Sequence, residues 1–120
     1  RISVYHGELF SRACGYRQMQ TLLEEVGSPD ALLTTAYVLL EGVFDALREQ
    51  GSEQWPSVRL ATFGDTQLLD FLPLRVNAMS QQHECIAERV LAWTLRAVEH
   101  NDYQPGIEAI GRRFKDRTQR

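Results

Sequence analysis

The stretch VRLATFGDTQLLDFLPLRVNAMSQQHECIAERVL, residues 58–91, decides the fold of this chain. It holds two β-capable runs, VRLATFG (58–64) and RVNAMS (75–80), and the segment between them is a short helix that Pro73 ends. A long helical pattern follows the second run directly. Strands that are joined through helices pair in parallel, because a tight hairpin cannot connect parallel strands. The stretch therefore predicts part of an α/β domain with a parallel sheet.

The same alternation continues on both sides of this stretch. Apolar spacing and glycine or proline stops predict further elements over these ranges: strands 2–6 and 31–36, a weak strand 107–116, and helices 9–26, 37–49 and 82–99. We therefore expect three layers, with helices packed on the faces of one sheet. The apolar arc of helix 82–99 is wide, so we expect this helix to be well buried, with Trp93 in the core.

Length and composition limit the class of protein. The chain has 120 residues, of which 43% are hydrophobic and 24% charged, and its formal net charge is -3. These values suit one globular domain with a core and exclude a multidomain enzyme or a disordered chain. The chain starts at Arg1 without a methionine or a leader, so we expect an excised fragment. No run approaches the about 20 apolar residues that span a bilayer, so no membrane segment is expected.

The cysteines and the uneven charge bear on compartment and partners. Cys14 and Cys85 lack the C-x-x-C spacing of redox and zinc motifs, which indicates a cytoplasmic protein with free thiols. Five of the 13 basic residues lie in the final segment GRRFKDRTQR (111–120). A short basic tail can contact phosphate, but this one carries no DNA-binding motif and is most simply a solvated terminal segment.

Four clusters of residues lie where the expected strands end, and ligands of open parallel sheets bind at that edge. The clusters are His6 and Gly7; Thr34, Thr35 and Ala36; Gly64 and Asp65; and Ser80 and Gln81. Asp65 can accept hydrogen bonds from sugar hydroxyls, or it can cap the short helix, a role also open to Thr66. Gln81 offers a donor and an acceptor to a neutral polyol, and it can equally be an exposed loop amide.

Motifs of catalysis, metal binding and nucleotide binding are missing from the sequence. The three histidines are too scattered for a metal site. No serine has a G-x-S-x-G context, and neither G-x-G-x-x-G nor G-x-x-x-x-G-K occurs. We therefore expect no catalysis, no metal and no cofactor. Trp55 is expected to be a loop residue that folds back on the sheet edge.

Two segments resemble the effector-binding domain of lac-repressor-family bacterial regulators: PDALLTTAYVLLEGVFDAL (29–47) and the stretch 58–91. Within the second, ATFGDTQLLDFL (61–72) is similar to the fructose-repressor branch of that family. The resemblance covers nearly the whole chain. It implies the type I periplasmic-binding-protein fold, a flavodoxin-like, doubly wound architecture with two subdomains and the ligand in the cleft between them.

By this resemblance the chain is one part of an effector-binding domain. Residues 1–74 match most of the C-terminal subdomain, 75–103 hold a strand and helix that cross to the N-terminal subdomain, and 104–120 hold a turn, a returning strand and the basic tail. The DNA-binding headpiece has no match in the chain, so operator DNA would be contacted only through that missing part. The first β-α unit of the C-terminal subdomain, with a phosphate-binding arginine, has no match either.

The resemblance also assigns residues. Asp65 falls on the family's sugar-binding aspartate, which would repel the phosphate, and Gln81 falls on the glutamine before the last long helix. Ala36 stands where the family often has asparagine, so a usual ligand amide is lost there. A dimer interface is implied through the helix 37–49 and the corner 72–74, with these residues: Tyr37, Leu40, Phe44, Leu72 and Leu74.

A sugar-phosphate effector follows from the same resemblance. The implied function is sensing of fructose 1-phosphate or fructose 1,6-bisphosphate by a cytoplasmic, homodimeric or tetrameric regulator of carbon metabolism. A sugar-binding protein of transport with the same fold is one alternative. A small α/β enzyme or receiver domain is another, although a receiver needs an acidic pair and a partnering lysine, and Lys115 is the one lysine here.

Overall fold

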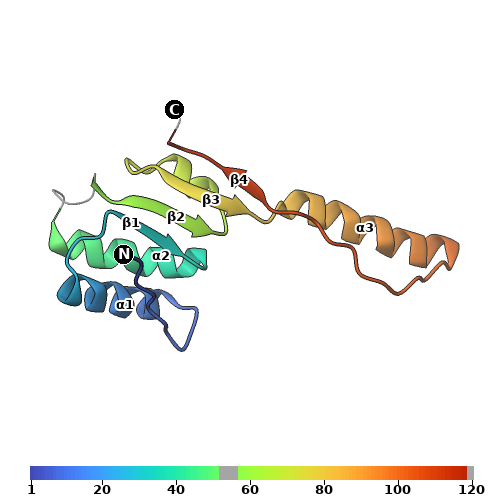
Figure 1. Ribbon diagram of the computed structural model, residues 1–120. Coiled ribbons are helices and arrows are strands. Elements are labelled where there is room, and N and C mark those ends of the chain that lie inside the picture. Colours follow the sequence, from blue (N-terminus) through green and yellow to red (C-terminus); the bar gives the residue numbers. More distant parts are fainter. Residues whose placement is uncertain (52–56, 119–120) are drawn as a thin grey trace.

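The computed structural model describes residues 1–51 and 57–118, which form a four-stranded sheet with helices (Figure 1). The elements follow the expected alternation, in this order: α1 (Arg12–Glu25), β1 (Ala31–Thr34), α2 (Tyr37–Gln50), β2 (Arg59–Phe63), the 3-10 helix η2 (Gln67–Asp70), β3 (Val76–Ser80), α3 (His83–His100) and β4 (Arg113–Lys115). Strands β1, β2 and β3 pair in parallel in that order, whereas β4 pairs with β3 in the antiparallel direction. The α/β class is confirmed. The last strand departs from the parallel direction because the chain returns to the sheet from the far end of α3.

The core lies between the sheet and its helices, and α2 runs between α1 and the sheet in Figure 1. Alternate residues of a strand face the same side, so Leu60 of β2 and the residues Val76 and Ala78 of β3 are buried together. The buried cluster consists of Met19, Leu22, Leu40, Val43, Ala46, Leu47, Val58, Leu60, Leu69, Val76 and Ala78. Two threonines are also buried, and Thr34 Oγ1 donates a hydrogen bond of 2.8 Å to Thr62 Oγ1.

Glycines allow α1 and α2 to approach closely. A Cβ on Gly42 would collide with backbone atoms of α1, the carbonyl oxygen of Arg12 among them, and one on Gly15 would collide with the carbonyl oxygen of Leu39. Beside this crossing, Arg12 forms a bidentate ion pair with the Asp45 carboxylate, with Nε 2.5 Å from Oδ2 and Nη2 2.7 Å from Oδ1. Helices α1 and α2 are therefore held together by close backbone packing and by an ion pair beside it.

The strand expected over residues 2–6 does not form, so this prediction was wrong. A strand needs a neighbour that takes up its backbone hydrogen bonds. The described sheet consists of the four strands β1, β2, β3 and β4, and residues 2–6 pair with none of them. The segment is held by a side chain instead: Tyr5 packs against the core, and its hydroxyl donates to Glu25 Oε2 at 3.0 Å. Ile2, in contrast, is 92% exposed.

Helix α3 projects away from the sheet, and the segment between α3 and β4 runs back beside it (Figure 1). No residue of α3 is buried, and several of its large apolar side chains are exposed: Ile86, Val90, Leu91, Trp93, Leu95 and Val98. The radius of gyration is 18.5 Å, whereas a compact domain of this length has one of about 14 Å. The expectation of a buried helix with Trp93 in the core was therefore wrong, because the described chain covers the apolar arc only in part.

Three smaller expectations have different outcomes. Cys14 is buried and Cys85 half-buried, and both are free thiols. Among the described residues, no helix is long and apolar enough to cross a bilayer. The expectation for Trp55 lies outside the described residues.

Candidate functional site

The carboxyl ends of β1, β2 and β3 meet at one edge of the sheet, because the three strands are parallel and in register. Phe63 ends β2 and is paired with Met79 of β3. Gly64 then turns the chain with a φ of 96°, which a glycine adopts readily, and its N–H donates to the Met79 carbonyl at 3.0 Å. A Cβ on Gly64 would lie 3.4 Å from Tyr37 Cβ, so the start of α2 contacts this loop.

The three residues predicted to bind a ligand lie at this edge. Ala36 directly precedes α2, Asp65 follows Gly64, and Gln81 directly follows β3. All three are half-buried. Gln82, the residue just before α3, has a left-handed backbone with a φ of 55°, so the chain turns sharply away from the sheet just after Gln81. The structure thus brings the predicted residues together at one edge, and their contact with a ligand stays a prediction.

Asp65 is an ion-paired carboxylate and not a helix cap. Thr66 caps η2, since its Oγ1 accepts a hydrogen bond from Leu68 N at 3.5 Å. Asp65 Oδ1 accepts a hydrogen bond of 2.7 Å from Arg117 Nη2, and Lys115 Nζ lies 3.9 Å from Asp65 Oδ2. The Asp65 side chain is 17% exposed. A carboxylate has about four acceptor positions, so capacity remains for a ligand hydroxyl.

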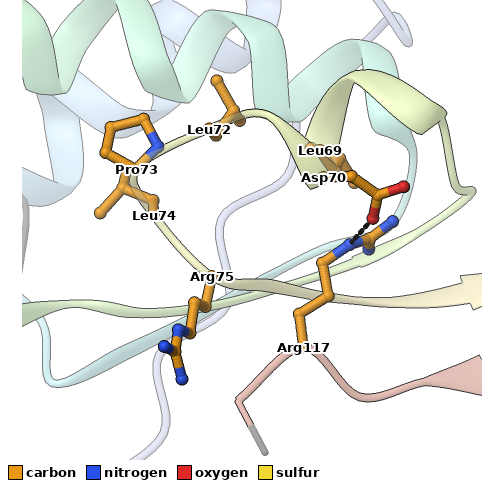
Figure 2. A pocket seen from close by; sticks show the side chains of 7 residues that line it. All are labelled: Leu69, Asp70, Leu72, Pro73, Leu74, Arg75 and Arg117. Atoms are coloured by element: carbon orange, nitrogen blue, oxygen red, sulfur yellow. Dashed lines mark hydrogen bonds and ion pairs between the residues drawn. The ribbon is translucent and has the colours of Figure 1, made fainter. Parts of the chain in front are cut away.

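Arg117 is the charged residue among the buried polar residues of the described chain. Its Nε donates to Asp70 Oδ1 at 2.9 Å, as Figure 2 shows, and its Nη1 donates to the Val76 carbonyl at 2.9 Å. Burial acts to lower the pKa of the Arg117 guanidinium, but the hydrogen bonds with Asp65 and Asp70 outweigh it, and this pKa is raised. Hydrogen bonds from Arg117, the larger effect, and from Lys115 hold the pKa of Asp70 below its usual value.

The expectation of a solvated basic tail was therefore wrong for its central part. Residues 113–115 form β4, and Arg117 just beyond is 2% exposed. The partners of Asp65, namely Arg117 and Lys115, were missed because the charge run was assigned to solvent. The weak strand expected over 107–116 was the signal that could have placed them beside the sheet. A further cation reaches the same sheet edge, since the guanidinium of Arg112 lies 5.5 Å from the centre of the Phe63 ring.

A hollow of about 290 Å³ lies at the other end of β3 (Figure 2). It is lined by Leu69, Asp70, Leu72, Pro73, Leu74, Arg75 and Arg117. Because residues 72–75 precede β3, this hollow is at the amino end of the strand, whereas Gln81 follows its carboxyl end. Ligands of parallel sheets bind outside the carboxyl ends, so we assign the candidate site to the edge with Asp65.

The residues predicted to form a dimer interface differ in exposure. Leu40 is 0% exposed and belongs to the core cluster, so it offers no surface to a partner, and its assignment to an interface was wrong. The other four, Tyr37, Phe44, Leu72 and Leu74, are partly buried and pack against the core. Their participation in an interface stays a prediction.

No protein-family profile matches this chain. The chain is similar to the fructose operon regulatory protein of Vibrio cholerae, with 49% identity over 113 residues that cover 94% of this chain and 34% of the relative. It is 36% identical over 104 residues to the catabolite repressor/activator of Escherichia coli K12, over 86% of this chain and 31% of the relative. The chain therefore spans about a third of the length of these curated relatives.

Two solved structures are similar to this chain, one in sequence and fold and the other in fold alone. The Cra transcriptional dual regulator from Pseudomonas putida, in complex with fructose 1-phosphate, is 55% identical with a TM-score of 0.80, over 94% of this chain and 42% of that one. A LacI family transcriptional regulator from Enterococcus faecium, with bound ribose, is 15% identical with a TM-score of 0.75, over 90% of this chain and 40% of that one, which shows a common fold alone. This chain is thus a homologue of the fructose operon regulatory protein and of the catabolite repressor/activator, with the α/β fold of LacI-family regulators.

Proposed function

We propose that this chain is the effector-sensing part of a cytoplasmic bacterial transcriptional regulator of carbon metabolism, and that its effector is a fructose phosphate. The observation that carries this proposal is the 55% identity, over 94% of the chain, to a regulator solved with fructose 1-phosphate. Fructose 1-phosphate is the first candidate and fructose 1,6-bisphosphate the second. The regulator works as a homodimer or tetramer without catalysis, and operator DNA is bound by segments that this chain does not contain.

Asp65 and Gln81 are the residues that we assign to the hydroxyls of the sugar. Both lie at the edge where three strand ends meet, and both carry acceptors, with Gln81 also supplying donors. Asp65 Oδ1 accepts from Arg117 Nη2, and Oδ2, which lies 3.9 Å from Lys115 Nζ, keeps acceptor capacity for a hydroxyl of the ligand. Ala36 has no polar side-chain atom, so it shapes the wall of the site without binding the sugar through a hydrogen bond.

The effector is proposed to bind in a cleft between two subdomains that close around it. We propose that residues 1–74 belong to one subdomain, that 75–103 cross to a second, and that 104–120 return to the first. Helix α3, which leaves the sheet and is followed by a returning segment, supports this division (Figure 1). An effector that contacts both subdomains stabilises their closed arrangement and so shifts the population of DNA-binding states.

Calorimetric titration of fructose 1-phosphate tests the proposal, in a regulator of the relatives' full length that carries this chain. Asp65→Ala should weaken binding by on the order of 1 to 3 kcal/mol, because a charge-assisted hydrogen bond is lost. Asp45→Ala is the matched control, since Asp45 is also paired with an arginine and is 22% exposed, against 17% for Asp65, but lies where α2 meets α1. This control should leave the affinity unchanged.

Two results would contradict the proposal at different points. Unchanged affinity in an Asp65→Ala protein with a native circular dichroism spectrum removes Asp65 from the site. Failure of the unsubstituted protein to bind fructose 1-phosphate at millimolar concentration removes this effector, and fructose 1,6-bisphosphate in the same titration tests the second candidate.

A further inference from the structure

Arg117 joins three separate segments of the chain through one buried side chain. Its side chain is 3% exposed, and the guanidinium donates to Asp65 in the loop after β2, to Asp70 in η2 and to the Val76 carbonyl at the start of β3. Its own backbone N–H donates to Asn77 Oδ1 at 2.8 Å. All three guanidinium nitrogens are thus engaged at 2.7 to 2.9 Å, which fixes the plane of the group.

The stability of the fold alone does not require an arginine at this buried position. Desolvating a guanidinium is costly, and an apolar side chain of similar volume is often as good or better for stability at a buried position. The planar fork of arginine does what an apolar residue cannot, because it holds two carboxylates in a set orientation at once. The Asp65 carboxylate has one oxygen bound by this fork and the other directed to Lys115, whose Nζ is 3.9 Å away.

We infer that Arg117 is a positioning residue of the effector site: it holds the Asp65 carboxylate through Oδ1, so that Oδ2, which Lys115 approaches only to 3.9 Å, is oriented to accept from a ligand hydroxyl before the ligand arrives. The inference rests on the proposed function of Asp65. Arg117 itself does not touch the ligand, and it acts only through the carboxylate. A side chain held in this way loses little freedom when the ligand binds, so the affinity depends on Arg117 even though the contact is made by Asp65.

Lys115 provides an internal comparison, because it approaches the same two carboxylates and lies only two residues before Arg117, at the end of β4. Its Nζ lies 3.2 Å from Asp70 Oδ1 and 3.9 Å from Asp65 Oδ2, and its side chain is 37% exposed. A flexible, solvated ammonium with no short contact to Asp65 cannot fix the orientation of that carboxylate. Removing Lys115 should therefore change the local charge as much as removing Arg117, with little effect on the geometry.

A double-mutant cycle tests the inference, with fructose 1-phosphate titrated by calorimetry into a full-length regulator that carries this chain. Arg117→Gln alone should lower the affinity about 10-fold, a value typical of losing one well-placed hydrogen bond. In the Asp65→Asn background the same substitution should lower the affinity less than 2-fold, because its effect passes through the missing carboxylate. Lys115→Gln should change the affinity less than 2-fold in either background.

Arg117→Lys is the second variant, and it distinguishes a loss of affinity from a loss of folding. Lysine retains the positive charge but not the fork, so we expect a native circular dichroism spectrum together with most of the loss of affinity. Equal losses from Arg117→Gln in both backgrounds would mean a general structural role and would overturn the inference while leaving Asp65 in the site. An Arg117→Lys protein that is folded and binds normally would overturn it as well. If the Asp65→Asn protein binds fructose 1-phosphate as tightly as the unsubstituted protein does, both the assignment of Asp65 to the site and the positioning role of Arg117 are refuted.

Discussion

The close crossing of α1 and α2 predicts that Gly42→Ala destabilises the chain, against the ordinary preference of helices. In an open helix this substitution stabilises by about 1 kcal/mol, because alanine is the better helix former. Here the added methyl group would collide with the backbone of α1 at Arg12, and a backbone atom cannot rotate away as a side chain can. Overpacking of this kind costs about 1 to 3 kcal/mol, and we take the upper end because the obstacle is a second helix. The net loss of unfolding free energy should be about 2 kcal/mol.

Urea unfolding followed by circular dichroism measures this loss, and two further variants sharpen it. Gly106→Ala is the matched control, since nothing lies within 4 Å of a Cβ at that position, and its unfolding free energy should change by less than about 0.5 kcal/mol. Gly15→Ala meets Leu39 at the same crossing, so the double variant with Gly42→Ala should lose less than the sum of the two single losses. A Gly42→Ala chain that is as stable as the parent, or more so, would refute the close crossing.

Two other predictions concern association and pH. The chain alone should self-associate, because α3 leaves side chains such as Val98, 76% exposed, in water; static light scattering that finds a monomer at all concentrations would count against this. Stability should fall on acidification below about pH 4, because hydrogen bonds from Arg12 and Arg117 hold the pKa values of Asp45 and Asp70 below normal in the folded state. The stability that they add is present above the unfolded pKa of about 3.9 and is lost as the pH falls through the lower folded values. Urea midpoints at pH 7 and pH 3 measure it, and the combined Asp45→Asn and Asp70→Asn substitutions should make the difference between them smaller.

The elements that could be predicted from sequence are those whose signal is local. The run 58–64 became β2 and the run 75–80 became β3, because β-branched and apolar residues bounded by turn residues specify a strand within a few positions. Residues 2–6 have the same local signal and no strand, since strand formation also requires a neighbour, which a five-residue pattern cannot reveal. Helix α3 shows the same limit: its wide apolar arc indicates that a surface is to be covered but not which part of a protein covers it.

The edge of the candidate site was predictable for a related reason. Ala36, Asp65 and Gln81 each follow a strand, and the rule that parallel strands end together needs no knowledge of side chains. The burial of Leu40 was not predictable in the same way, because one apolar stripe on α2 serves either a core or an interface. Sequence periodicity gives the face of a helix, and the tertiary structure decides what that face meets.

The electrostatics at Asp65 could not be predicted, and they bear on the proposed binding of a sugar phosphate. The partner of Asp65 lies 52 positions later in the chain, and only the pairing of β4 with β3 brings it there. With Asp65, Asp70, Lys115 and Arg117 in contact, two negative groups are matched by two positive ones. A phosphate near this edge would therefore meet a locally neutral cluster, although the chain as a whole carries a charge of -3. The expected repulsion between Asp65 and the phosphate of the proposed effector is reduced accordingly, so the proposed contact of a sugar hydroxyl with Asp65 does not require the phosphate of the same ligand to lie far from this edge.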